Sequence, residues 1–139
     1  MSPPIKQGRT PRELTLLKYI ELKTGYNDDG PAWIGRVKAS KSGRTLYFNG
    51  RALKKGVRGA SGNYVDLKTG EIFWVSGVKR DSADRHWAGS GKVLIEAAAV
   101  QEYLSVVGRT ELDKTRFAVT DAIQETDPAD FVELENRPL

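Results

Sequence analysis

The sequence predicts a mainly β protein: a small five-stranded barrel of the SH3-like or OB-like type, with one C-terminal helix. Three observations lead to this prediction. Apolar and polar residues alternate over several short segments, glycine-containing turns join these segments, and one stretch near residue 100 has helical spacing instead. Many short strands joined by tight turns are typical of small barrels, and 139 residues are enough for one domain.

The first strand is expected within residues 14–23. There, Leu17 and Tyr19 alternate with Ile20 and Leu22, which favours a strand with two partly covered faces over a helix. The preceding residues hold three prolines and few apolar side chains, so a flexible arm is expected. The following segment, 25–31, is dense in Gly, Asn, Asp and Pro and is predicted to be a loop.

Two β-hairpins are predicted in the middle of the chain. In the first, residues 33–40 and 44–49 flank the turn 41–43, and in the second, residues 63–67 and 71–76 flank the turn 68–70. Each turn ends in glycine, which readily takes the positive φ that closes a short hairpin. The basic segment 54–62 between the hairpins is predicted to be mobile.

A further strand and a helix follow. Residues 92–96 are short and β-branched, as strands are. Residues 97–107 then begin with three alanines and place apolar side chains at i, i+3, i+4 and i+7, ending at Gly108. This spacing predicts an amphipathic helix with a glycine C-cap, covering one open end of the sheet.

These elements divide the chain into three parts. Residues 1–12 form the arm, residues 13–108 form the barrel domain with its terminal helix, and residues 109–139 form an acidic, partly ordered tail. Within the tail, residues 116–120 are one further candidate strand.

The charge of the chain is unevenly placed. The net charge of +4 is modest, but residues 34–92 carry thirteen Lys or Arg against four Asp or Glu, a net +9. Residues 111–139 carry three bases against eight acids, a net −5. This split indicates either a tail that interacts with other molecules or one that folds back on its own basic domain, although two ordinarily solvated faces are a third interpretation.

Composition excludes several kinds of chemistry. The absence of cysteine rules out disulfides, thiolate zinc sites and thiol nucleophiles. With a single histidine, the common zinc sites are also excluded, and residues 27–30 lack the alternation and terminal Glu of a calcium loop. We therefore expect no metal and no cofactor. No window approaches the roughly 18 uncharged apolar residues of a membrane helix, so a cytoplasmic protein is expected.

The densest polar cluster is 84–92 (Asp-Arg-His-Trp-Ala-Gly-Ser-Gly-Lys). His86 and Asp84 are a conceivable base and orienting acid, with Ser90 as nucleophile, but neighbours in one loop do not supply that geometry. A loop that packs Trp87 is the favoured interpretation, and we predict that the protein is not an enzyme. As a phosphate-binding loop the segment also fails, because His86 takes the place of the first glycine and a strand follows instead of a helix.

Several short motifs resemble those of one protein family. They include Tyr-Phe-Asn-Gly (47–50), Trp-Val-Ser-Gly-Val-Lys (74–79) and the polar cluster 84–92. Over about two thirds of the chain, they resemble a family of small bacterial proteins without established function, some of which are named deoxyxylulose-phosphate synthase. That synthase is a large thiamine-diphosphate enzyme, so the resemblance implies no mechanism or cofactor for this chain.

A binding surface is the remaining candidate for function. Basic side chains on or beside the first hairpin would neutralise phosphates, and alternation turns one of Tyr47 and Phe48 outward, where it could stack on a base. The predicted nucleic-acid or partner-binding residues are Arg36, Lys38, Arg44, Tyr47, Arg51, Lys54, Lys55, Arg58, Arg85 and Lys92.

Two other functions stay open. The chain could be a protein-protein interaction module whose arm and acidic tail order on a partner, in which case the basic side chains would face an acidic protein surface. A small enzyme centred on His86 is the weaker alternative. No membrane partner is expected.

Overall fold

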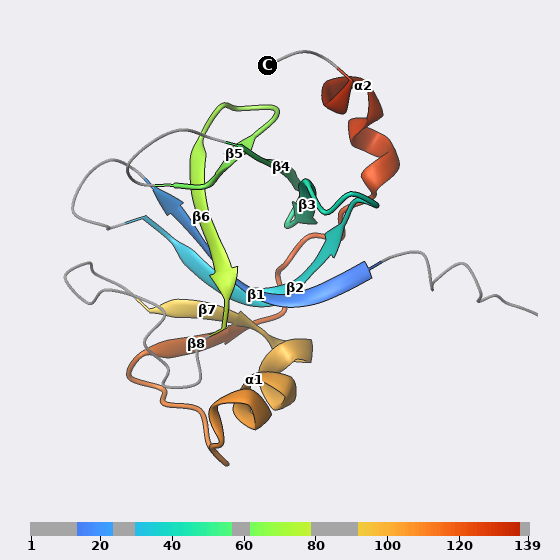
Figure 1. Cartoon of the computed structure of the whole chain (residues 1–139). Coiled ribbons are helices and arrows are strands. Elements are labelled where there is room, and N and C mark those ends of the chain that lie inside the picture. Colours follow the sequence, from blue (N-terminus) through green and yellow to red (C-terminus); the bar gives the residue numbers. More distant parts are fainter. Residues whose placement is uncertain (1–13, 24–29, 57–61, 79–91, 137–139) are drawn as a thin grey trace, which may run out of the picture.

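The computed structural model describes residues 14–23, 30–56, 62–78 and 92–136, and the description below is confined to them (Figure 1). These residues form a mainly β structure in which eight strands belong to one sheet. The strands are β1 (Leu14–Lys23), β2 (Ala32–Ala39), β3 (Thr45–Phe48), β4 (Arg51–Lys55), β5 (Tyr64–Asp66), β6 (Ile72–Gly77), β7 (Val93–Glu96) and β8 (Phe117–Thr120). The helical elements are η2 (Ala97–Ala99), α1 (Val100–Val107), η3 (Pro128–Phe131) and α2 (Val132–Glu135).

The first six strands close into an antiparallel barrel in the order β1-β6-β5-β4-β3-β2, and β2 pairs with β1 along its length. The other edge of β2 is shared. Near its end it pairs with β3, where Lys38 lies opposite Tyr47, and near its start it pairs in parallel with β7, where Ile34 lies opposite Ile95. The sheet therefore forks at β2, and β7 and β8 extend it outside the barrel.

This architecture confirms the predicted small β-barrel, but it has more strands than expected. The additional barrel strand is β4, which lies partly in the segment that the sequence predicted to be mobile. It follows β3 through a two-residue turn at Asn49 and Gly50, whose φ angles are 51° and 77°. Two positive φ values are characteristic of the type I′ turn that joins twisted antiparallel strands.

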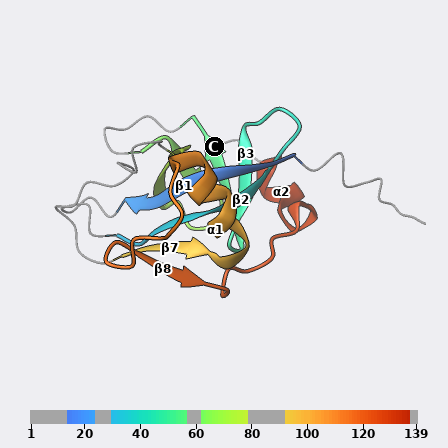
Figure 2. The same ribbon diagram turned by 90° about the horizontal axis from the view of Figure 1, so that it is seen from below.

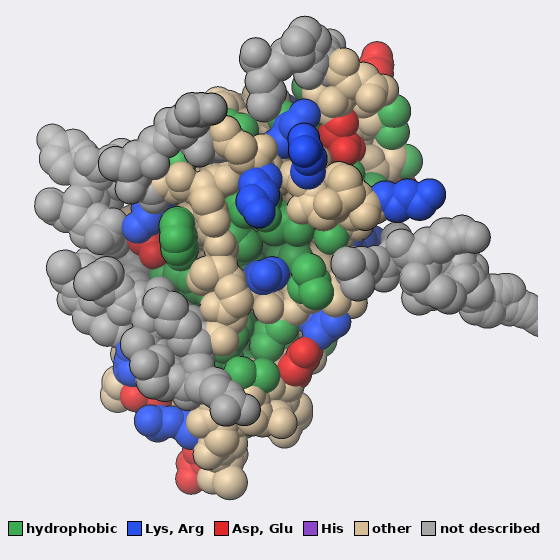
Figure 3. All heavy atoms as spheres, in the orientation of Figure 1, with side chains coloured by type: hydrophobic (Ala, Val, Ile, Leu, Met, Phe, Trp, Pro, Cys, Tyr) green, Lys and Arg blue, Asp and Glu red, His purple; other side chains and the backbone are tan. Residues whose placement is uncertain are grey.

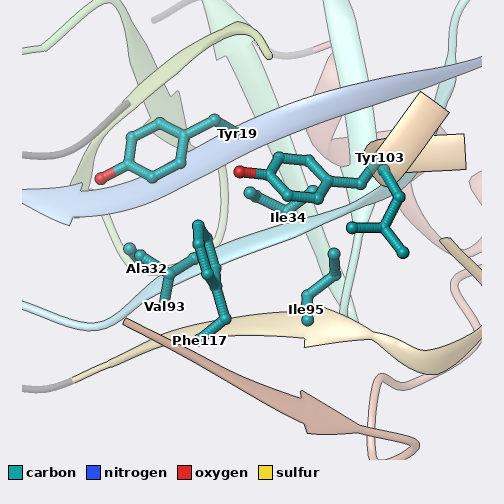
Figure 4. Close-up of a cluster of buried hydrophobic side chains, with 8 residues drawn as sticks. Tyr19, Ala32, Ile34, Val93, Ile95, Tyr103 and Phe117 are labelled. Carbon is teal, nitrogen blue, oxygen red and sulfur yellow. The ribbon is translucent and has the colours of Figure 1, made fainter. Parts of the chain in front are cut away.

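Three clusters of buried hydrophobic side chains form the core. The first fills the barrel and includes Ile20 and Phe73. The second lies outside the barrel, between β1, β2, β7, β8 and α1, and includes Tyr19 and Phe117 (Figure 4). The third, on the outer faces of β3 and β4, is considered below. Tyr19 and Ile20 thus enter different clusters, which confirms that β1 is covered on both faces.

The predicted helix and its glycine C-cap are present, but the helix lies elsewhere than expected. Gly108 has φ 70°, and its N–H donates to the carbonyl groups of Leu104 and Ser105. The buried ring of Tyr103 lies 5.3 Å from that of Phe117. Because the helix packs on the outer face of β1 and β2, beside β7 and β8, it does not close an end of the barrel (Figure 2). The three alanines at its start form the 3-10 turn η2.

The acidic tail packs against the barrel domain through its described residues, 109–136. The candidate strand at 116–120 is present as β8, and its Phe117 belongs to the second cluster. Farther along, Phe131 packs on Tyr47 and Ala52 in the third cluster. We call residues 124–135 the strap, because this segment runs over the outer faces of β3 and β4, with α2 at the opposite end of the molecule from α1 (Figure 1). The predicted boundary at Gly108 therefore does not separate two packing units.

Candidate nucleic-acid interface

Two hairpin ends meet at one place on the barrel surface. The turn between β2 and β3 presents Arg44, and the end of β4 presents Lys55, whose backbone N–H donates to the Arg44 carbonyl over 2.8 Å. The two side chains line a surface hollow of about 480 Å³ together with Ser42, Gly43 and Gly56, and none of the described residues that line it is acidic. Lys41 and Lys54 are the nearest further bases along these two segments, and we call the four residues Lys41, Arg44, Lys54 and Lys55 the basic rim.

The hairpin turn fixes the position of Arg44. The Ser40 N–H donates to the Thr45 carbonyl and the Gly43 N–H to the Ser40 carbonyl, both over 2.9 Å, so the turn closes on its own backbone. Gly43 has φ 77°, a value that side-chain-bearing residues rarely take. The Arg44 side chain is therefore held at the end of a short turn and is exposed to solvent.

The charges of the basic rim are not neutralised by other described residues. Among the described residues, the bases that form ion pairs include Lys23, Arg36, Lys38 and Arg51. None of the four rim residues takes part in such a pair. Figure 3 shows basic side chains on the face that carries β6, over and beside a group of hydrophobic ones. A cluster of unpaired cations raises the local concentration of anions.

Arg51, in contrast, has a structural role. Its guanidinium donates to Asp66 over 2.6 Å and to Glu71 over 2.9 Å, and it lies 5.1 Å from the centre of the Phe73 ring. Asp66 is 2% exposed and also accepts from the backbone N–H groups of Lys68 and Thr69. This network ties β4 to the β5–β6 turn, and it uses the charge that was predicted to bind phosphate.

Arg36 and Lys38 are also paired, in both cases with residues from the C-terminal half of the chain. Arg36 contacts the Glu102 carboxylate of α1 and donates to the Thr15 carbonyl over 2.8 Å. Lys38 donates to Glu125 over 3.2 Å and to the Thr126 carbonyl over 3.1 Å. The acidic tail therefore does fold back on the basic hairpin, one of the three interpretations of the charge pattern.

The expectation that Tyr47 or Phe48 offers an exposed ring is wrong for the folded chain, because each residue is only 4% exposed. Phe48 points into the barrel, edge-on to Trp33 at 6.3 Å. Tyr47 points outward, as alternation requires, but the Phe131 ring covers it at 6.1 Å. Its hydroxyl donates to Glu135 over 2.7 Å, and burial together with this carboxylate raises the pKa of Tyr47.

The remaining predicted residues do not join the rim. Lys92 is exposed just before β7, beside the start of β2, whereas the rim lies beyond the end of β2. Six residues of extended strand separate these ends, a distance of about 20 Å. Arg58 and Arg85 lie outside the described residues, as do Asp84, His86 and Ser90, so the structure does not place the polar cluster.

Sequence reasoning missed that Arg44 and Lys55 face each other, although the sequence carried a signal for it. Asn-Gly is the dipeptide most typical of a type I′ hairpin turn. A two-residue turn at 49–50 sets Phe48 opposite Arg51, and counting back sets Thr45 opposite Lys54, which is the observed register. The next pair along the hairpin is Arg44 with Lys55.

Neither a metal site nor a membrane-spanning helix is found among the described residues. They contain no group of three or more His, Cys, Asp or Glu side chains able to hold a metal ion. None of the helices formed by the described residues is long and apolar enough to cross a membrane.

Comparison with known proteins leaves the chain without a family assignment. No family model matches it, no curated protein matches it, and no solved structure matches it. The resemblance to the small bacterial family therefore stays a prediction, and function must be argued from the basic rim itself.

Proposed function

We propose that this protein is a small binding module that holds the phosphate backbone of a nucleic acid at the basic rim. The observation that carries the proposal is the hollow in which Arg44 and Lys55 lie side by side, with no acid among its described lining residues. Lysine and arginine bind nucleic acid by neutralising phosphates and releasing condensed counterions, which requires cations that are not already paired.

The local sequence supports this proposal. Residues 38–56 contain six Lys or Arg and no Asp or Glu. Acids from elsewhere in the chain pair with two of these bases, Lys38 and Arg51, and the other four make up the rim. On a duplex, four phosphate contacts predict that the logarithm of the binding constant falls with the logarithm of salt concentration with a slope of about −3.6.

The described residues that line the hollow include no aromatic ring, so we propose contacts to phosphate and not to bases. Such contacts position a nucleic acid but carry no sequence information directly. Binding is therefore expected to depend strongly on salt and weakly on sequence. Small SH3-like or OB-like barrels bind ligands on one face. We propose that this barrel is of one of these two types.

A protein-protein interaction module is the second candidate, and one observation favours it. Trp74 on β6 is 40% exposed, and exposed tryptophans are common anchors of protein interfaces. The tail gives this function little support, because its described residues already pack on the barrel and are not waiting for a partner to order them. That the protein is not an enzyme, without metal or cofactor, stays a prediction, because His86 lies outside the described residues.

Fluorescence anisotropy with labelled single-stranded and duplex oligonucleotides tests the proposal. The double variant Arg44→Gln/Lys55→Gln is expected to bind at least tenfold more weakly than the unmodified protein at low salt. Its control is Arg109→Gln/Lys114→Gln, which removes two exposed charges between α1 and β8 and is expected to change the affinity less than about twofold. Equal losses in the two variants, or no binding by the unmodified protein at low salt, would reject the proposal.

A further inference from the structure

The surface beneath the strap is continuous with the basic rim. Lys38 and Tyr47 are opposite each other across β2 and β3, so their side chains lie on the same outer face. Ala52 lies opposite Tyr47, and Lys54, a member of the rim, lies opposite Thr45, two residues farther along the same face. If the strap were displaced, the Lys38 cation and the Tyr47 ring would extend the rim along this face.

The strap makes the same two kinds of contact there that a nucleic acid would make. It contains five acids and no base, and its Glu125 carboxylate accepts from Lys38. Its Phe131 ring covers Tyr47, and Lys68 lies 5.8 Å above the same phenylalanine ring. Proteins that bind single strands combine cations for the phosphates with aromatic rings on which bases stack.

We infer that the strap occupies an extension of the nucleic-acid site, in which Lys38 and Lys68 contact phosphates and Tyr47 stacks on a base of a single strand. A bound single strand displaces the strap, so the free protein holds its own acidic competitor. This inference rests on the proposed function of the basic rim, and it adds a ligand class, because only an unpaired strand presents a base face to Tyr47.

The attachment of the strap is compatible with displacement. It is held at its start by hydrogen bonds from the Gly50 N–H to Thr126 and from the Gln124 N–H to Asn49, and at its end by Phe131 and Glu135. Between these attachments lies a hollow of about 360 Å³, and residues 124–127 and Lys68 are among those that line it. The two short helices of the strap, η3 and α2, have four residues each, which is too short to be stable without packing.

A tethered competitor lowers the apparent affinity by the fraction of molecules in which the site is open. Weakening the strap should therefore strengthen binding without any new contact. Phe131 and Val132 form a matched pair for this purpose, because Phe131 is buried against Tyr47 whereas its neighbour Val132 is 53% exposed.

The test measures binding of a labelled single-stranded oligonucleotide to full-length variants. Phe131→Ser is expected to bind at least tenfold more tightly than the unmodified protein, and Val132→Ser within twofold of it. In the Phe131→Ser background, Lys38→Gln is expected to weaken binding at least fivefold, whereas in the unmodified protein it should not weaken binding. Circular dichroism establishes that each variant is folded.

A second variant covers the case in which Phe131→Ser does not fold. Glu125→Gln/Glu135→Gln keeps the apolar anchor but removes the two carboxylates that contact Lys38 and Tyr47, and it too should bind more tightly. If neither strap variant binds more tightly while Arg44→Gln/Lys55→Gln still binds more weakly, the inference is overturned and the rim proposal stands. If the rim variant binds as the unmodified protein does, the proposed function fails.

Discussion

The hydroxyl of Tyr47 donates a hydrogen bond of 2.7 Å to Glu135, 88 positions later in the chain. The bond joins a barrel strand to the last helix, and it accompanies the packing of Phe131 on the same tyrosine ring. The acidic end of the chain is therefore attached to its basic hairpin by one polar and one aromatic contact on a single residue.

Removing the Tyr47 hydroxyl tests how much its hydrogen bond to Glu135 contributes to the free energy of unfolding. Tyr47→Phe keeps the ring and its contact with Phe131, so we expect the free energy of unfolding to fall by about 1 kcal/mol, the usual net value of one hydrogen bond. Urea denaturation measures the change. Tyr64→Phe is the control, because no described residue bonds to the Tyr64 hydroxyl, and an equal loss in both variants would contradict the assigned role.

Alkaline pH should destabilise the protein through its buried tyrosines. Burial raises the pKa of Tyr47 and of Tyr64, and in Tyr47 the Glu135 carboxylate raises it further. The folded chain therefore holds these protons more tightly than the unfolded chain, whose tyrosines titrate near pH 10. The stabilising contribution is complete below about pH 10 and is lost as the pH rises above it.

Thermal unfolding measured from pH 8 to pH 11 checks this expectation, with tyrosinate absorbance recorded in parallel. The melting temperature should fall above about pH 10, and Tyr47→Phe should reduce the fall. A variant as sensitive to alkali as the unmodified protein would show that Tyr47 is not a source of the effect.

The Arg51 network is expected to be the most sensitive polar feature of the barrel. Arg51→Met leaves the buried carboxylate of Asp66 with backbone donors only, so a loss of about 2 to 3 kcal/mol in the free energy of unfolding is expected. Lys54→Met, on the same strand, removes a charge that has no ion-pair partner among the described residues and should cost less than about 0.5 kcal/mol. Similar losses in the two variants, measured by urea denaturation, would refute this assignment.

The same network makes a smaller contribution to acid sensitivity. The hydrogen bond from Arg51, followed by that from Thr69, lowers the pKa of the Glu71 carboxyl. A lowered pKa stabilises the fold above the pKa of the unfolded glutamate, and this contribution is lost as the pH falls through the folded value. Because Glu71 is 41% exposed, the solvent screens much of the effect. Glu71→Gln should flatten the dependence of stability on pH below about pH 5, whereas an unchanged profile would exclude a contribution from Glu71.

Two turn glycines with the same φ of 77° should respond differently to alanine. A Cβ at Gly43 meets nothing, so only backbone strain of about 1 kcal/mol is expected. A Cβ at Gly50 would collide with the amide end of the Gln124 side chain, so Gly50→Ala must also displace this side chain at the start of the strap. We expect Gly50→Ala to be the more destabilising in urea and, unlike Gly43→Ala, to increase cleavage of the strap in limited proteolysis. Equal effects would argue against the contact between the turn and the strap.

Much of the fold was predictable because local patterns determine it. Alternation identified β1, β2 and β6, and helical spacing with Gly108 identified α1 and its end. The strand β4 was missed because its two lysines lie at the start of a glycine-rich basic segment, which favours a mobile loop when composition is considered alone. The Asn49-Gly50 turn supplied the contrary signal, since it fixes where a returning strand must begin.

The site was harder to predict because pairing depends on contacts that are distant in sequence. The basic character of the first hairpin was evident, but nothing near Lys38 or Arg51 indicates that Glu125 and Asp66 will neutralise them. Alternation placed Tyr47 on the outer face, which is where it lies. Only the return of the strap, 84 positions later at Phe131, covers it.

The salt dependence of oligonucleotide binding tests the central claim most directly. For a duplex, which contacts only the four rim residues, the unmodified protein should give a slope of about −3.6 in a plot of log binding constant against log salt concentration, and Arg44→Gln/Lys55→Gln should make it shallower by about 1.8, the value for two lost phosphate contacts. An unchanged slope in this double variant would contradict the claim that the basic rim holds the phosphate backbone.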